Sequence, residues 1–319
     1  MLTPDFHQLQ SIDAEALAAE ARAGLMAVRA RASPKFFYDA LGSRLFDAIT
    51  ELDEYYPTRT EAAIFAAHGD AIAAAARQRL GPGFGLVDLG AGDGAKAARL
   101  FDLLRPSRYV AVDISIDFLR LSLQRLQRAH PSITMVGVGL DFSAHLQLPD
   151  SLCPGRSLVF YPGSSIGNFD PDDALRLLRQ ARALARGGAL LIGVDLVKDS
   201  ATLEAAYDDA LGVTAAFNLN LLRHLNRLIG SDFAARQWQH LARYDHGLSR
   251  IEMHLLARQA LTVSWPGGSR HFDAGERLHT ENSYKWTLPG FDALLRDAGW
   301  QQLQHWTDDA QAFAVVLAS

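Results

Sequence analysis

Short apolar runs alternate with helical patterns between residues 84 and 197, and this alternation limits the choice of fold more than any other feature. The runs are FGLVDLG (84–90), RYVAVDIS (108–115), ITMVGVGLDF (133–142), RSLVFYPGSSIGN (156–168) and ALLIGVDLV (189–197). Near-continuous apolar strands separated by helices are typical of a parallel sheet that is buried on both faces. In the segment DPDDALRLLRQARALARGG, Asp170 is the predicted N-cap, Pro171 takes the first helical position and Gly187 ends the helix. We therefore predict an α/β domain.

The alternation stops after residue 197, and a compact pattern returns near residue 288. There, GFDALLRDAG predicts a helix, and WQQLQHWTD and AFAVVLAS predict two strands with only a short turn between them. Parallel strands need a long crossover, so this last pair is predicted to be antiparallel. The intervening stretch predicts two helices, ATLEAAYDDAL and AAFNLNLLRHLNRLI, followed by several strands with a hairpin at TVSWPGGSRHF.

The insert between these parts is too long for a structureless loop, so we expect it to form a second, α+β lobe. We place a sheet domain at residues 62–197 and 288–319, and the second lobe at residues 20–61 and 198–287. In the linking stretch LDEYYPTRTEAAIF, Thr58 and Glu61 have the spacing of a capping box, which predicts that a helix begins there. This helix would hold Tyr55 and Tyr56 on a proline-stiffened elbow, although core packing explains both rings equally well.

The composition is that of an ordinary globular protein, with 49% hydrophobic and 21% charged residues in a chain of 319. A net charge of −5 argues against nucleic acid as a partner, because phosphate binding needs clustered Lys and Arg in excess. A single cysteine, Cys153, excludes an internal disulfide, and the spacing of the eleven histidines predicts no metal site. No apolar run has the length of a membrane span, and the N-terminal stretch lacks the features of a signal peptide. We expect a cytoplasmic protein with no membrane partner and, by default, a monomer.

A glycine-rich segment, DLGAGDG (88–94), follows the first predicted strand and precedes a helix that begins near Lys96. Such glycines allow a tight turn and a close approach to a ligand, and a helix N-terminus offers free N–H groups. Gly90, Gly92 and Ala95 also fit the GxGxxA form of the dinucleotide motif. Asp113, at the end of the second strand, suits a ribose hydroxyl of either NAD or S-adenosylmethionine (SAM). The segment alone therefore leaves NAD, SAM and a plain glycine turn open.

Further features favour SAM. Asp88 places an acid ahead of the glycines, and Asp141 with Phe142 follows the third strand, where the pair is suited to an adenine amino group and ring. By fold analogy, the antiparallel C-terminal pair is typical of class I SAM methyltransferases, which have a Rossmann-like sheet. The fourth strand ends in PGSSIGN and not in the Asn- or Asp-Pro-Pro-aromatic sequence of enzymes that methylate base amines. This again argues against a nucleic-acid substrate.

At this point the chain resembles a specific family, the SAM-dependent histidine Nα-methyltransferases of ergothioneine biosynthesis, which convert L-histidine to hercynine. The resemblance runs through FFYDALGSRLFDAITELDEYYPTRTE, the glycine segment, GSSIGN, DLVKD, AYDDALGVTAAFN, RIEMHL and TENSYKW to the C-terminal strands. It implies a class I sheet domain with an inserted substrate-binding lobe, SAM as cofactor and L-histidine as substrate. For the cofactor it implies contacts from Gly90 and Lys96, ribose binding by Asp113 and adenine contacts from Asp141 and Phe142; we add Asp88 and Gly92 from the glycine segment.

The resemblance also implies a set of substrate contacts. Gly163 and Ser165 match the loop region for the substrate carboxylate, and Asn168 matches the residue that holds the α-amino group. The other implied contacts are to the head group (Tyr55 and Tyr207), to the region beside it (Tyr38 and Phe46) and to the imidazole (Glu281, Ser283 and Met253). The acid at the imidazole position favours histidine over an indole substrate.

Structural roles explain several of these residues equally simply. Met253 shares one face of a predicted strand with Ile251 and Leu255, which is a core pattern. Glu281 and Ser283 also share a face, and an edge strand would show that face to solvent. The remaining structural alternatives are core packing for Tyr38 and Phe46, helix packing for Tyr207 and a turn or cap for Asn168.

Methyl transfer to an amine needs a neutral, well-aimed nitrogen more than it needs a covalent nucleophile. The catalytic residues we predict are Asn168 and Tyr55, which would orient the lone pair of the α-amino group, while burial beside the SAM cation favours loss of its proton. The alternatives are the same reaction on another amino acid or an aromatic amine, an NAD oxidoreductase, and a SAM-binding regulator without activity.

Overall fold

The computed structural model describes residues 2–9, 13–114 and 116–319. Its described part divides into two compact units. Unit 1 comprises Met1–Ser11, Thr60–Leu196 and Trp286–Ser319, and unit 2 comprises Ile12–Arg59 and Val197–Lys285. The chain therefore passes between units at residues 11/12, 59/60, 196/197 and 285/286. The sequence analysis began the second lobe at residue 20 and placed the later boundaries at 61/62, 197/198 and 287/288.

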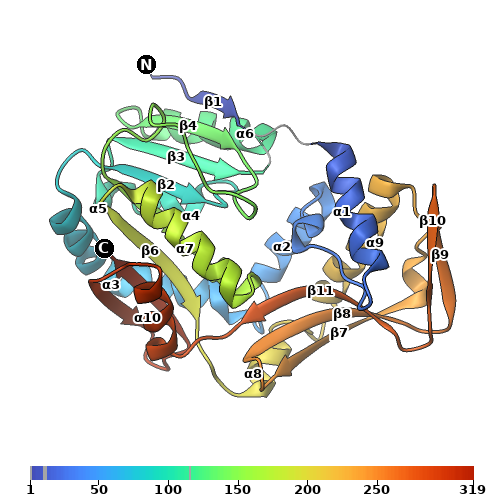
Figure 1. The fold of residues 1–319 in the computed structure, drawn as a ribbon. Helices are drawn as coiled ribbons and strands as arrows, with labels where there is room; N and C mark the ends of the chain where they lie inside the picture. The colour runs from blue at the N-terminus through green and yellow to red at the C-terminus, as the bar shows by residue number, and fades with distance from the viewer. Residues whose placement is uncertain (1, 10–12, 115) are drawn as a thin grey trace. The chain divides into compact units, whose positions relative to one another are not determined.

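Unit 1 is built on a mixed sheet in the order β1-β4-β3-β2-β5-β6-β13-β12 (Figure 1). Its strands are β1 (Asp5–Gln8), β2 (Gly85–Leu89), β3 (Arg108–Asp113), β4 (Thr134–Gly139), β5 (Ser157–Tyr161), β6 (Ala189–Asp195), β12 (Leu303–Thr307) and β13 (Phe313–Ala318). Strands β1 to β6 run parallel, and β13 is antiparallel to both β6 and β12. The α/β class, the apolar strands and the antiparallel C-terminal pair are thus confirmed, whereas β1 was not expected.

Helices cover both faces of this sheet. They are α3 (Tyr56–Leu80, which belongs to unit 1 from Thr60), α4 (Ala95–Ala98), α5 (Phe101–Leu104), α6 (Ile116–Ala129), α7 (Pro171–Ala185) and α10 (Leu288–Asp297). Side chains alternate along the strands, so that Val87 packs in a core with α7 and α10, and Leu86 packs in a core with α3 and α6. Helix α7 begins at Pro171 and ends before Arg186, which adopts a left-handed conformation (φ 53°) just ahead of Gly187.

The predicted start of the long helix at Thr58 is wrong. Helix α3 begins at Tyr56, so Pro57 lies in its first turn. Proline is suited to the first turn because its fixed φ is already helical and its missing N–H has no partner to lose there. The Glu61 carboxylate does not cap this helix. It binds Lys96 and the backbone of Gly163 instead.

Unit 2 combines helices with two small antiparallel sheets, as expected for an α+β lobe. Its helices are α1 (Ala14–Met26), α2 (Ala40–Thr50), α8 (Ser200–Ala205) and α9 (Val213–Ile229), with short 3₁₀ turns at Pro34–Phe37 and Ala235–Gln237. The sheets are β11-β8-β7 and β10-β9, formed by β7 (Trp238–Asp245), β8 (Arg250–Ala257), β9 (Leu261–Trp265), β10 (Gly268–Phe272) and β11 (Arg277–Tyr284). The β9–β10 hairpin is confirmed. The first helix of the insert is shorter than expected, because it ends at Ala205 and leaves Tyr207 beyond it.

Candidate functional site

The glycine segment lies at the end of β2, where the order of the strands reverses. Strand β2 has β3 on one side and β5 on the other, and ligands of open α/β sheets bind outside the carboxyl ends of the strands at such a switch point. Gly90, Gly92 and Gly94 have φ values of 70°, 54° and 71°, a region that non-glycine residues rarely adopt. A Cβ on Gly94 would lie 2.7 Å from the Leu126 side chain. The segment therefore needs all three glycines for their backbone conformation, and Gly94 for space as well.

An acid and an aromatic ring flank this turn. The N–H of Gly92 donates a hydrogen bond of 3.0 Å to Asp113 Oδ2. The Phe142 ring lies beside Gly90, since a Cβ there would be 3.8 Å from Phe142 Cζ. Next to Phe142, Asp141 accepts a hydrogen bond from the backbone N–H of Ser143. A carboxylate and a ring beside a tight glycine turn fit a nucleoside, with the carboxylate for the ribose and the ring for the base.

Asp88 supports the segment from inside unit 1. Its carboxyl group is buried and accepts a hydrogen bond of 2.7 Å from the Tyr109 hydroxyl. Burial raises the pKa of Asp88 to about 7, against the opposing effects of the Tyr109 hydrogen bond and the Lys96 charge. The observed partner of Asp88 is therefore a core tyrosine.

Glu61, which the sequence analysis treated only as a capping residue, joins two loops of unit 1. Its Oε2 accepts a hydrogen bond of 2.8 Å from Lys96 Nζ, and its Oε1 accepts one of 2.7 Å from the N–H of Gly163. Lys96 belongs to α4, directly after the glycine segment, and Gly163 belongs to the loop after β5. Glu61 thus brings Lys96 and Gly163, two of the predicted site residues, to one carboxylate.

The loop after β5 has an unusual backbone. Gly163 (φ 78°) and Ser164 (φ 59°) are both left-handed, and the Ser164 hydroxyl accepts a hydrogen bond of 2.8 Å from the N–H of Asp195. The 3₁₀ turn Ser165–Asn168 follows, with Ser165 exposed and Asn168 half-buried. Asn168 is not the cap of the next helix, because Asp170 holds that position in α7.

In unit 2, aromatic rings form an edge-to-face chain. The ring centroids of Tyr38 and Phe46 are 5.8 Å apart, those of Phe46 and Tyr55 are 6.1 Å apart, and those of Tyr55 and Tyr207 are 6.3 Å apart. Tyr38 is 43% exposed, Phe46 and Tyr55 are half-buried, and Tyr207 is buried. The chain of rings thus runs from the surface of unit 2 into its core, and it contains the four aromatic residues predicted to contact the substrate. Aromatic faces suit a methylated ammonium group, which has no N–H to donate.

Tyr56 has a different environment from Tyr55. Its ring is buried, the Lys198 ammonium lies 4.4 Å from the ring centroid, and Lys198 Nζ donates a hydrogen bond of 2.7 Å to the Tyr56 hydroxyl. The sequence-based interpretation, in which Tyr56 packs inside and Tyr55 faces the head group, agrees with this placement of Tyr56.

The residues predicted to recognise an imidazole lie together on β8 and β11. Glu281 is the cross-strand partner of Met253, and Ser283 is that of Ile251. All of these side chains are buried, with Glu281 8% exposed. Strand β11 is an edge strand of its sheet, as the alternative interpretation supposed, but this face of it is buried and does not open to solvent. Met253 does pack in the core of unit 2 with Ile251 and Leu255, as alternation predicted.

Burial and charge shape this cluster. Burial raises the pKa of Glu281 to about 8, although the nearby Lys285 ammonium partly opposes the shift. Lys285, which the sequence analysis did not single out, is only 3% exposed. Its Nζ donates hydrogen bonds to Ser283 Oγ (2.8 Å) and to the Tyr207 hydroxyl (3.0 Å), and these two oxygens are 2.7 Å apart. Its position two residues after Ser283 was the signal in the sequence, since residues two apart in an extended segment point to the same side, and Lys285 directly follows β11.

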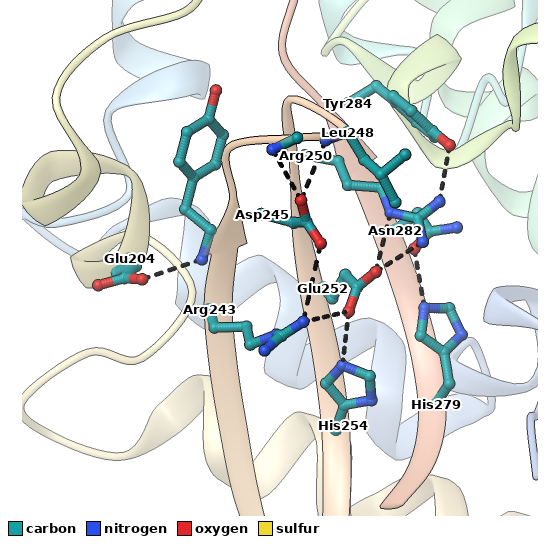
Figure 2. A network of polar contacts seen from close by, with 12 residues as sticks. Glu204, Arg243, Asp245, Leu248, Arg250, Glu252, His254, His279, Asn282 and Tyr284 are labelled. Carbon is teal, nitrogen blue, oxygen red and sulfur yellow. Dashed lines mark hydrogen bonds and ion pairs between the residues drawn. The ribbon is translucent and has the colours of Figure 1, made fainter. Parts of the chain in front are cut away.

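The opposite face of β8 carries a charged network (Figure 2). Glu252 accepts hydrogen bonds from Arg250 Nη2 (2.6 Å) and from His254 Nε2 (3.0 Å), and Arg250 Nη1 donates one of 2.6 Å to the Tyr284 hydroxyl of β11. Burial opposes the ionisation of Glu252, but these bonds outweigh it and lower its pKa to about 2. The network therefore ties β8 to β11, the strand that carries Glu281 and Ser283 on its other face.

Two further findings bear on ligands and location. Within residues 2–9, 13–114 and 116–319, no group of three or more His, Cys, Asp or Glu side chains is arranged to hold a metal ion. No helix in the same part of the chain has the length and apolar character needed to cross a membrane.

Comparison with known proteins gives consistent matches over the chain. Residues 17–319 match the model of a family described as histidine-specific, SAM-dependent methyltransferases. A histidine N-alpha-methyltransferase of Mycolicibacterium smegmatis is 42% identical over 96% of this chain and 95% of its own length. One from Mycobacterium tuberculosis is 39% identical over 95% of each chain. Ergothioneine biosynthesis protein 1 of Neurospora crassa is 28% identical over 85% of this chain and 31% of its own length.

Proposed function

Because the chain belongs to the family of histidine-specific, SAM-dependent methyltransferases, we propose that it methylates the α-amino group of L-histidine. Three successive transfers would give hercynine, the histidine betaine, in the first step of ergothioneine biosynthesis. The near full-length match to histidine N-alpha-methyltransferases carries this proposal. The family membership also removes the NAD oxidoreductase alternative.

Residues of unit 1 fit the cofactor. The glycine turn, Asp113 and Phe142 would hold the nucleoside of SAM, and the Lys96 ammonium is suited to its carboxylate. When bound, SAM supplies a methyl group on a positively charged sulfur. A neutral amine can take this methyl group in line, with the sulfur as the leaving group. The α-amino group of an amino acid is largely protonated at neutral pH, so the protein must favour its neutral form. We assign the orientation of that amine to Asn168 and Tyr55.

Residues of unit 2 supply the proposed contacts to the side chain of the substrate. Glu281 and Ser283 are suited to the nitrogen atoms of an imidazole, because a carboxyl group and a hydroxyl can each donate or accept a hydrogen bond. An indole has a single N–H and no acceptor nitrogen, so it offers one hydrogen bond where an imidazole offers two. This chemistry favours histidine over tryptophan as the substrate.

The direct test is mass spectrometry of L-histidine after incubation with the protein and SAM, with tryptophan and tyrosine in parallel reactions. We expect histidine alone to gain three methyl groups. If histidine gained none while SAM still raised the melting temperature of the protein, the cofactor would stand and the substrate would be wrong. Methylation of tryptophan or tyrosine would then identify the alternative substrate.

We also propose a monomer that acts in the cytoplasm without nucleic-acid or membrane partners. The net charge of −5 argues against a nucleic-acid partner, and the free, buried thiol of Cys153 fits a reducing compartment. Light scattering coupled to gel filtration tests the oligomeric state. A mass twice that of the chain would contradict the monomer.

A further inference from the structure

The Glu61 carboxylate is a buried charge with a partner for each oxygen. It is 2% exposed, Lys96 Nζ lies 2.8 Å from Oε2, and the N–H of Gly163 lies 2.7 Å from Oε1. A buried carboxylate is costly unless both oxygens are hydrogen-bonded, and here one bond also carries an opposite charge. The arrangement is therefore a complete bridge between two segments of unit 1.

These segments lie on the two sides of the switch point in the sheet. Lys96 follows the turn at the end of β2, Gly163 follows β5, and β2 and β5 are neighbouring strands. Glu61 itself comes from a third element, helix α3. One carboxylate thus fixes the positions of both loops at the edge of the sheet where α/β proteins bind their ligands.

The surrounding glycines leave room for this bridge. A Cβ on Gly193 of β6 would lie 2.2 Å from Glu61 Oε1, and a Cβ on Gly163 would lie 3.1 Å from Lys96 Nζ. Neither position accepts a larger residue without moving the carboxylate or the ammonium. Only the carboxylate end of this ion pair is buried, because the Lys96 side chain is 42% exposed. A simple packing role would not need a charge at Glu61, because apolar side chains of similar volume often replace buried charged groups without loss of stability.

We propose that Glu61 is a positioning residue for methyl transfer. Its Oε2 holds the Lys96 ammonium where it is suited to SAM, and its Oε1 holds the Gly163 backbone where the loop is suited to the carboxylate of the amino acid. Glu61 touches neither ligand and acts only through these two partners. The identity of the ligands rests on the proposed function, but the bridge itself does not.

The two oxygens allow the two effects to be separated. Glu61→Gln keeps an acceptor for the Gly163 N–H, and its amide N–H group then faces Lys96, where two donors oppose each other. Lys96 regains side-chain freedom that SAM binding must remove, so we expect the Kd of SAM to rise about fivefold, with a nearly unchanged histidine KM. Glu61→Ala loses both bonds, and we expect the histidine KM at saturating SAM to rise as well, by about tenfold.

A double-mutant cycle tests the first effect without any need for activity. SAM binding is measured by calorimetry for Glu61→Gln, Lys96→Met and the combination of the two. We expect the double variant to bind SAM no more weakly than Lys96→Met alone. Additive losses would overturn the role of Lys96 as the intermediary. This result is independent of the substrate, so a failure of histidine methylation in the wild type remains distinguishable from a failure of this inference.

Glu204→Ala is the matched control for the second effect. Glu204 also accepts a hydrogen bond from a backbone N–H, that of Tyr244 at 2.9 Å, but it belongs to unit 2 outside the candidate site. We expect this variant to lower the melting temperature and to leave the Kd of SAM and the histidine KM unchanged. If Glu61→Ala showed that same pattern, Glu61 would be a structural residue only. If Glu61→Ala did not fold, the nearly isosteric Glu61→Gln would still decide the matter through the Kd of SAM.

Discussion

Met253 of β8 lies directly opposite Glu281 of β11 in the antiparallel pair. The thioether and the core around it separate the carboxyl group from water, and this burial raises the pKa of Glu281 to about 8. Below that pH the isolated protein therefore holds a protonated carboxyl group at a buried position, against the opposing effect of the Lys285 ammonium. This carboxyl group can bind a polar partner, and its titration makes the stability of the protein depend on pH.

Replacing Glu281 by Gln should stabilise the protein at alkaline pH. The folded pKa is raised from an ordinary value of 4.5, so between pH 4.5 and 8 the folded state binds more protons than the unfolded state. The stability from Glu281 is thus fully present below pH 4.5 and is lost as the pH rises through 8. We expect Glu281→Gln to exceed the wild type at pH 9 by on the order of 2–4 kcal/mol in urea denaturation, and to differ little at pH 5.

The same variant should bind histidine poorly. Gln cannot take up or release a proton, and we expect the histidine KM to rise at least about tenfold with little change in SAM binding. Glu204→Gln is the control, because this acid lies outside the imidazole cluster. For the stability prediction, equal pH profiles of unfolding free energy in Glu281→Gln and the wild type would contradict the raised pKa of Glu281.

Replacing Lys285 by Met should act on the substrate alone. The variant keeps most of the volume but removes the ammonium that donates to Ser283 and to Tyr207. Its hydrogen bonds fix the positions of both hydroxyls, so we expect the histidine KM to rise about tenfold and the Kd of SAM to stay unchanged. The pKa of Glu281 should rise further, because the Lys285 charge lowers it.

Lys35→Met is the control for this variant. It breaks an ion pair with Glu20 elsewhere in unit 2 and should change neither the histidine KM nor the Kd of SAM. A loss of SAM affinity in Lys285→Met would contradict this assignment.

The sheet was predictable because its strands are apolar over their whole length. A parallel sheet that is buried on both faces leaves this pattern in each strand separately, and the short turn before β13 allows only an antiparallel neighbour. Strand β1 has the sequence DFHQ and shows no such pattern, since pairing with β4 and not local propensity makes it a strand. The start of α3 was misplaced because a capping-box spacing describes a local option, which Pro57 and the distant partners of Glu61 outweigh.

The candidate site also has one part that the sequence predicts and another part that it does not. The glycine turn is a local motif and could be found directly, but Glu61 and Gly163 are 102 residues apart, and Tyr207 and Lys285 are 78 residues apart. A single sequence contains no signal for such pairings. The aromatic and imidazole contacts were reached by resemblance to a family, and their roles stay predictions. The structure adds two charged residues that the sequence analysis did not assign to the site: Glu61, which binds Lys96 and Gly163 in unit 1, and Lys285, which binds Ser283 and Tyr207 in unit 2.

The charged network behind Glu281 should make unit 2 sensitive to acid. Burial lowers the pKa of His254 to about 4, so the unfolded state binds more protons than the folded state between pH 6.5 and 4. Stability from this group is present above pH 6.5 and is lost as the pH falls through 4, and Glu252, with a pKa of about 2, adds a loss below pH 4.5. We expect His254→Gln to reduce the loss of unfolding free energy between pH 6.5 and 4, as measured by urea denaturation at a series of pH values. His271→Gln, at an exposed histidine of β10, should lose as much unfolding free energy over this pH range as the wild type. An equal loss in His254→Gln would contradict the role given to His254.

Asn168→Ala tests the proposed amine contact. The side chain is half-buried at the end of a 3₁₀ turn and does not cap α7, so its loss should cost little stability. If its amide orients the α-amino group, kcat should fall by about a hundredfold while the Kd of SAM changes less than about threefold. Asp170→Ala, which alters the N-cap two residues later, controls for a disturbed helix start. Unchanged turnover in Asn168→Ala would remove this residue from the catalytic assignment.

Gly163 and Gly155 form a matched pair that separates backbone strain from contact with Lys96. Both are left-handed, with φ of 78° and 84°, so alanine costs about 1 kcal/mol of strain at either position. A Cβ on Gly155 meets open space, whereas a Cβ on Gly163 lies 3.1 Å from Lys96 Nζ. We expect similar losses of melting temperature in Gly155→Ala and Gly163→Ala. Only Gly163→Ala should raise the histidine KM and the Kd of SAM, because it displaces the loop and the ammonium that Glu61 holds. Equal kinetics in the two variants would show that this loop tolerates displacement, and the bridge through Glu61 would then lose its functional role.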